Sequence, residues 1–109
     1  MKASKNPSAH VIVWEFIAPA GREREFEEVY GPRGEWARLF ARGVGYLGSE
    51  LWRDAATPRR YWVIDRWETE AAFEAFKSRH HEEYEALDRR CEALTEKETR
   101  LGGFVSEGG

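Results

Sequence analysis

This sequence has few branched aliphatic residues for a folded domain. Leu, Ile and Val total 15 of its 109 residues, no more than the 15 contributed by Phe, Trp and Tyr. Such a shortage is typical of disordered chains when the net charge is also large. Here the formal net charge is only −3, and Trp and Tyr can bury the missing apolar area. The length allows one domain. Because a domain this short buries only about two thirds of its unfolded surface, we expect it to self-associate.

Cysteine and long apolar runs are also scarce. The single cysteine, Cys91, excludes an internal disulfide and any metal motif built on a cysteine pair, which fits a reducing compartment. The apolar run Val11–Ile17 is interrupted by Glu15 and is too short to cross a bilayer, and no signal-peptide core precedes it. We therefore expect a cytoplasmic protein with no membrane partner. With 17 basic and 20 acidic residues, the charge balance also disfavours a nucleic-acid partner.

Small polar residues at both ends, 1–9 and 106–109, predict flexible tails around one domain that spans 10–105. Alternating β-forming residues and turn signals predict four strands in this domain: His10–Ile17, Tyr46–Arg53, Arg60–Glu68 and Thr99–Val105. Between the first two strands, apolar residues at helical spacing predict a helix in two pieces, one containing Phe26–Tyr30 and the other Trp36–Phe40.

A longer apolar stripe follows the third strand. Its residues are three or four apart, which predicts a helix with Thr69 as its N-cap: Phe73, Phe76, His80, Tyr84, Leu87, Cys91 and Leu94. Unbroken, this helix would extend roughly 37 Å, longer than the domain is wide. We therefore expect a bend near Ser78–His81.

The element order β-α-β-β-α-β predicts an α+β, ferredoxin-like fold with an antiparallel sheet. The first and third strands are apolar on both faces. In the first, Ile12, Trp14 and Phe16 alternate with Val11, Val13 and Ile17; in the third, Tyr61, Val63 and Trp67 alternate with Trp62 and Ile64. The helices can cover only one face of the sheet, so we expect the other face to pair with a second copy of the chain.

Four segments carry a resemblance to a known family: VIVWEF, APAGREREFEEVY, GYLGSELWRD and YWVIDRWETEAAFEAF. From Val11 to Phe104 the chain resembles the antibiotic biosynthesis monooxygenase (ABM) domain of the dimeric α+β barrel superfamily. The resemblance implies a homodimer in which two four-stranded sheets pack face to face. One branch of the family oxygenates polycyclic phenols or hydroquinones without metal or flavin, another degrades haem, and many members have no known reaction.

The haem branch uses an Asn on the first strand and a Trp and a His on the long helix. Counting back from Gly21, the Asn position falls on Trp14, and the only Asn of the chain, Asn6, lies in the N-terminal tail. Phe76 corresponds to the helix Trp, and Tyr84–Ala86 lie near the expected His. The resemblance therefore argues against haem degradation.

His80 is the sharpest catalytic candidate, because a histidine within an apolar stripe should face the sheet and can act as a base. Tyr84 would be its hydrogen-bond partner. The alternative is a structural histidine, either buried against a backbone carbonyl or turned outward by the bend. His81, about 100° further round the helix, should face solvent. Because Cys91 lies roughly 16 Å along the helix from His80, one chain offers no metal-ligand set.

The aromatic residues predict an apolar pocket for a flat substrate, with Trp14, Trp36, Trp67 and Phe76 as candidate substrate-binding residues. The alternative, which we favour for any one of them, is that they fill the core in place of aliphatic side chains.

Glu15, Glu50, Asp65 and Arg66 lie within the strands. The acids could be buried with raised pKa values, but cross-strand ion pairs are more common, and we expect the latter.

These patterns lead to two hypotheses. The first is a cofactor-independent monooxygenase that acts on a small phenolic or quinol-like aromatic molecule with dioxygen. The second is a non-catalytic, dimeric ligand-binding or scaffold protein. A cavity that reaches His80 would favour the enzyme, and a core filled by Trp and Phe would favour the scaffold.

Overall fold

A computed structural model of the chain describes residues 9–107. It contains four strands and four α-helices, which follow one another in this order: β1 (His10–Ile17), α1 (Glu23–Tyr30), α2 (Glu35–Phe40), β2 (Tyr46–Arg53), β3 (Arg60–Trp67), α3 (Glu70–Arg79), α4 (His81–Arg90) and β4 (Lys97–Val105). A 3-10 turn at Glu92–Leu94 lies between α4 and β4. Residues 1–8 and 108–109 of the predicted tails lie outside the described residues.

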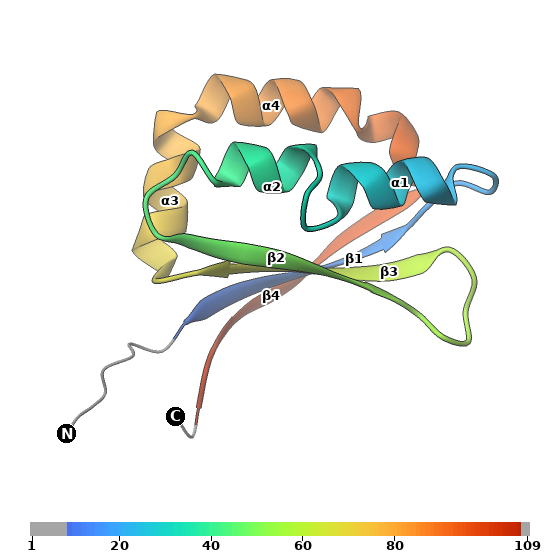
Figure 1. Ribbon diagram of the computed structural model, residues 1–109, viewed down its shortest axis with the longest axis horizontal. Coiled ribbons are helices and arrows are strands. Elements are labelled where there is room, and N and C mark those ends of the chain that lie inside the picture. The colour runs from blue at the N-terminus through green and yellow to red at the C-terminus, as the bar shows by residue number, and fades with distance from the viewer. Residues whose placement is uncertain (1–8, 108–109) are drawn as a thin grey trace.

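The strands form one antiparallel sheet in the order β2-β3-β1-β4, and the helices lie together on one face of it (Figure 1). The predicted α+β, ferredoxin-like fold is therefore confirmed. The strand limits differ from the prediction at two ends only, since β3 ends at Trp67 and β4 begins at Lys97.

The long helix is broken as predicted. Thr69 caps α3, its Oγ1 accepting a 3.0 Å hydrogen bond from the backbone N–H of Ala72. His80 leaves helical geometry at φ −112° and ψ 33°, and α4 begins at the next residue. The side chain of His81 is 66% exposed, in agreement with the expected solvent orientation.

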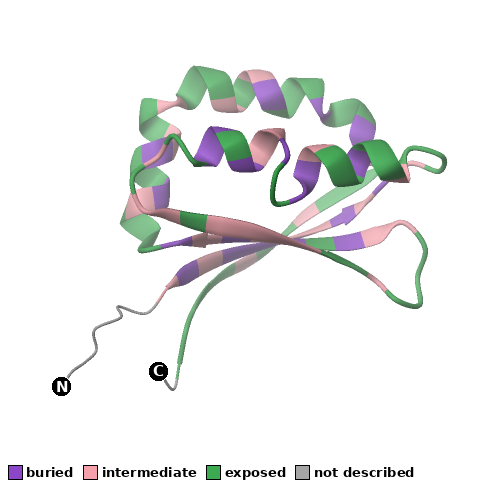
Figure 2. Cartoon of the chain, viewed as in Figure 1, coloured by how far each residue is buried: buried purple, intermediate pink, exposed green. Residues whose placement is uncertain are grey.

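The buried residues lie between the helices and the inward face of the sheet (Figure 2). The core that they form is mainly aromatic. The largest fully buried side chains are Trp67, Tyr61, Phe26 and Ile12. Within residues 9–107, no helix covers the opposite face of the sheet. Trp52 and Trp62, which are paired across β2 and β3, are 58% and 43% exposed there.

A β-bulge interrupts the alternation of β2. Tyr46 pairs with Trp67 but Gly48 pairs with Arg66, so Leu47 is an extra residue, and Gly48 has φ +126°. Strict alternation would put Tyr46 and Ser49 on opposite faces of the sheet. The bulge brings both side chains to the helix-covered face.

Candidate functional site

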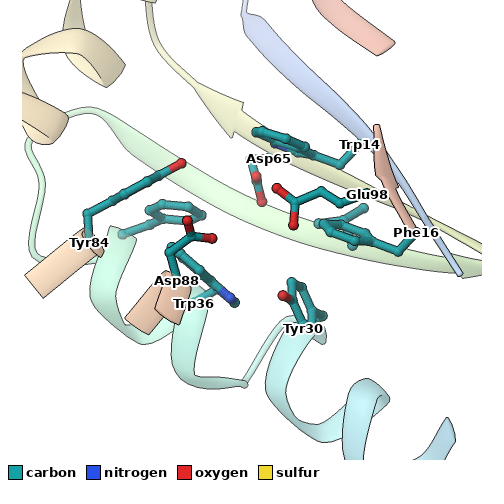
Figure 3. A pocket seen from close by; sticks show the side chains of 10 residues that line it. Trp14, Phe16, Tyr30, Trp36, Asp65, Tyr84, Asp88 and Glu98 are labelled. Carbon is teal, nitrogen blue, oxygen red and sulfur yellow. The ribbon is translucent and has the colours of Figure 1, made fainter. Parts of the chain in front are cut away.

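A narrow pocket lies between the inward face of the sheet and helices α1, α2 and α4 (Figure 3). Its cavity is about 40 Å³, which holds only a few water molecules in this conformation. The lining is mostly aromatic but includes three carboxylates: Trp14, Phe16, Tyr30, Trp36, Phe40, Val63, Asp65, Tyr84, Asp88 and Glu98.

Asp65 is the buried acid of this pocket, with only 5% of its surface exposed. Its Oδ1 accepts a 2.7 Å hydrogen bond from Ser49 Oγ, and Ser49 Oγ lies 2.6 Å from the hydroxyl of Tyr46. No donor within residues 9–107 contacts Oδ2. Burial raises the pKa of Asp65 to about 6, because the Ser49 hydrogen bond only partly offsets the cost of removing a carboxylate from water. Asp65 therefore changes charge near neutral pH.

Aromatic rings form the walls around this carboxylate. Trp36 and Tyr84 meet edge to face with centroids 5.2 Å apart, and Trp14 stacks on Phe16 at 6.1 Å. Burial raises the pKa of Tyr84 to about 12, with the nearby carboxylates adding to the effect, so its phenol stays neutral and can donate a hydrogen bond. Figure 3 shows the Tyr84 hydroxyl pointing toward the side of the pocket that holds Asp65.

Two further carboxylates lie at the rim. Asp88 on α4 and Glu98 on β4 are both exposed, in contrast to Asp65. Partial burial and the neighbouring charge of Asp88 raise the pKa of Glu98 above its ordinary value. The pocket thus has a buried acid at its inner end and two acids at its mouth.

The predicted site residues divide into two groups. Trp14 and Trp36, predicted as substrate-binding residues, line the pocket together with Tyr84, predicted as the hydrogen-bond partner of His80. Trp67 and Phe76 do not line it, since they are 0% and 2% exposed and pack together in the core with ring centroids 5.4 Å apart.

His80 also lies outside the pocket. It borders a separate surface hollow beside Gly43, and its ring packs on Phe76 with centroids 5.1 Å apart. The helix breaks at His80, and its side chain, only 13% exposed, is covered at this break by Phe76 and does not reach the pocket. The cavity therefore does not bring His80 together with Tyr84 and Trp14.

The charged residues within the strands follow expectation except at one position. Arg60 pairs with Glu15 at 2.8 Å, which lowers the pKa of Glu15. Hydrogen bonds from Trp52 Nε1 and from Arg66, which is 2.8 Å away, lower the pKa of Glu50. The expected ion pair is wrong for Asp65. The sequence does indicate that Asp65 faces inward. It lies an even number of residues along β3 from Tyr61, Val63 and Trp67, whose side chains face the helices.

Within residues 9–107, no three His, Cys, Asp or Glu side chains are grouped closely enough to hold a metal ion. No helix in the same part of the chain is long and apolar enough to span a membrane.

Comparison with known proteins identifies the family. Residues 9–87 match the family described as antibiotic biosynthesis monooxygenase. The chain belongs to this family. Among proteins with curated descriptions, none has significant similarity to the sequence.

Solved structures of this ABM protein's relatives share its fold. SnoaB of Streptomyces nogalater, described as a cofactor-independent oxygenase, is 25% identical, with a TM-score of 0.67 over 94% of this chain and 96% of SnoaB. PA3566 of Pseudomonas aeruginosa is 17% identical, with a TM-score of 0.66 over 94% of this chain and 98% of that protein. MhuD of Mycobacterium tuberculosis, described as a heme-degrader, is 24% identical, with a TM-score of 0.63 over 90% of this chain and 95% of MhuD.

Proposed function

We propose that this ABM protein is a cofactor-independent monooxygenase that acts on a small phenolic or quinol-like molecule, with Asp65 as the catalytic base. The observation that carries the proposal is a buried carboxylate in an aromatic pocket, with a pKa of about 6 and one oxygen to which no described residue donates a hydrogen bond. Groups with such a pKa suit proton abstraction near neutral pH. The likeness to SnoaB supports the reaction type.

In the proposed reaction, Asp65 Oδ2 takes the proton of the substrate hydroxyl, and the resulting phenolate supplies electrons to dioxygen. For oxidation of a phenol to a quinone, the substrate loses four electrons and O₂ gains four. One oxygen atom bonds to the ring carbon, and the other leaves as water with the hydrogens of the hydroxyl and of that carbon. Asp65 returns its proton to the departing oxygen. The protein supplies the base, excludes water and holds the two reactants together.

The other pocket residues have positioning roles in this proposal. Tyr84 donates a hydrogen bond to the substrate, and Trp14 and Trp36 hold its ring. Trp67 and Phe76 support these walls from the core. We assign the base to Asp65 in place of His80, because His80 borders a different hollow.

Oxygen uptake on a panel of hydroquinones and phenols, with the products identified by mass spectrometry, tests the function. We expect Asp65→Asn, which keeps the size of the side chain, to abolish turnover, and His80→Ala to retain it. In wild type, kcat/KM should rise with pH through about 6 as Asp65 loses its proton. Oxygen uptake by Asp65→Asn at the wild-type rate would eliminate Asp65 as the base.

A second candidate, a non-catalytic ligand-binding or scaffold protein, is favoured by the small cavity of about 40 Å³. It predicts ligand binding without oxygen uptake for every compound of the panel. Haem degradation is disfavoured because Trp14 and Phe76 stand at two of the positions that the haem branch uses. A stoichiometric haem complex with a shifted Soret band would reverse that conclusion.

We also propose that the chain forms a homodimer through the helix-free face of the sheet. Trp52 and Trp62 are exposed there, and Leu101 and Phe104 of β4 are 41% and 51% exposed. Exposed apolar side chains on one face of a sheet are typical of protein interfaces. The same face of a second copy would cover them.

A further inference from the structure

The charge of the pocket points to a narrower class of ligand than a phenol. Its ten lining residues include three carboxylates, Asp65, Asp88 and Glu98, but no Lys, Arg or His. Arg100, the register partner of Trp14 on β4, lies outside the lining, and its Nη2 is placed beside Gly103. The pocket therefore has a negative potential.

The carboxylates are not evenly placed. Asp65 is 95% buried, no donor within residues 9–107 hydrogen-bonds its Oδ2, and it lines the cavity. Asp88 and Glu98 are exposed and lie at the mouth. Figure 3 shows all three carboxylates turned toward the same space, which is bordered by Trp36 and Tyr84. A ligand that fills this space meets both carboxylates and aromatic rings.

We propose that the pocket selects a one-ring aromatic molecule with a protonated amine, its ring between Trp14 and Trp36 and its ammonium group between Asp88 and Glu98. This inference rests on the proposed site and adds to it the class of substrate. A cation is attracted both by carboxylates and by the faces of aromatic rings, whereas an anion would be repelled by all three acids. At about 40 Å³ the cavity has to widen to admit even one ring, and a fused polycycle would require a larger opening still.

The arrangement also gives the ligand a direction. A hydroxyl group directed inward meets Asp65 Oδ2, the proposed base, while the amine remains at the mouth, where water still solvates part of it. Proton transfer to Asp65 moves one negative charge from the protein to the ligand. The ammonium group keeps the total charge of the ligand from becoming negative, which offsets the repulsion from Glu98 and Asp88.

Three probes that share a para-substituted phenol test the inference: tyramine, which is cationic, 4-ethylphenol, which is neutral, and 4-hydroxyphenylacetate, which is anionic. Binding is measured by calorimetry and tryptophan fluorescence without oxygen at pH 7.5, so that no turnover is required. We expect tyramine to bind roughly tenfold more tightly than 4-ethylphenol, and the anion to bind most weakly.

Variants at the mouth locate the effect. The double variant Asp88→Asn/Glu98→Gln should reduce tyramine affinity roughly tenfold and leave 4-ethylphenol unchanged. Glu82→Gln, an exposed substitution on the same helix as Asp88, is the matched control and should change neither. Unfolding curves show whether each variant is folded.

The outcomes separate this inference from the proposed function. Preference for tyramine that the double variant removes supports the inference even if no probe consumes oxygen. Equal or tighter binding of the anion, or no binding of any probe, overturns it. Oxygen uptake with neutral phenols and no preference for the amine would support the oxygenase and eliminate the proposed selectivity.

Discussion

Ser49 on β2 and Asp65 on β3 are register partners, and Ser49 Oγ donates a 2.7 Å hydrogen bond to Asp65 Oδ1. The partner of this buried carboxylate is therefore a neutral hydroxyl, whereas Glu15 and Glu50 on the opposite face pair with arginines. A single neutral donor does not compensate for lost hydration, which is why burial dominates the pKa of Asp65.

The first prediction concerns the stability cost of this acid. The pKa of Asp65 is about 6 in the folded chain and about 4 when unfolded, so the unfolded chain releases the proton first. The free energy of unfolding should then fall as pH rises from about 4 to 6 and stay low above, by roughly 3 kcal/mol in total. Asp65→Asn should lack this contribution and be more stable than wild type at pH 7.5, as measured by urea unfolding across pH. If the free energies of unfolding of wild type and Asp65→Asn change in parallel with pH, the prediction is wrong.

The second prediction concerns Ser49. Ser49→Ala removes the only hydrogen bond that a described residue donates to Asp65, so the pKa of Asp65 should rise further, by up to about one unit. The acid limb of the kcat/KM profile should move to higher pH by the same amount, and the carboxyl carbon signal of Asp65 in NMR titrations should follow. Tyr46→Phe, which leaves the Ser49 hydroxyl in place, should shift the limb less. If the acid limb of the kcat/KM profile does not move in Ser49→Ala, the pH dependence does not arise from Asp65.

Strong patterns made most of the fold predictable. The two-faced alternation of β1 and β3, the Thr69 cap and the excessive length of the helical stripe each have a direct physical meaning, and each is found in the structure. The bulge in β2 was not predictable in this way. One extra residue, Leu47, shifts the alternation of side chains between the two faces after Tyr46, so that Ser49 faces the helices as well. The alternation of apolar and polar residues in the sequence does not reveal an insertion of one residue.

The site was predictable only in part. Trp14, Trp36 and Tyr84 line the pocket because their spacing along strand and helix holds. His80 does not line it, because its ring packs on Phe76 beside a separate hollow, although the stripe continues inward after the break through Leu87 and Cys91. Asp65 was misjudged because an acid within a strand is more often ion-paired, and only the bulge that brings Ser49 inward provides it with a neutral partner.

The third prediction tests the placement of His80. His80→Ala removes the contact with Phe76 and leaves the pocket residues in place, so we expect kcat/KM to be unchanged and the free energy of unfolding to fall by about 1 kcal/mol. Steady-state oxygen uptake and urea unfolding measure the two effects. If His80→Ala loses turnover while its free energy of unfolding is unchanged, His80 has a catalytic role.

The last prediction tests the helix-free face of the sheet. Trp52 and Trp62 are register partners and are half exposed, so a charge in either position should be buried without a partner in the proposed dimer. Trp62→Glu should therefore convert the dimer to a monomer, as measured by sedimentation velocity. Val44→Glu is the control, because Val44 is 88% exposed in the turn before β2 and not on the sheet. A wild-type chain that sediments as a monomer, or a Trp62→Glu variant that stays dimeric, would exclude this face as the interface.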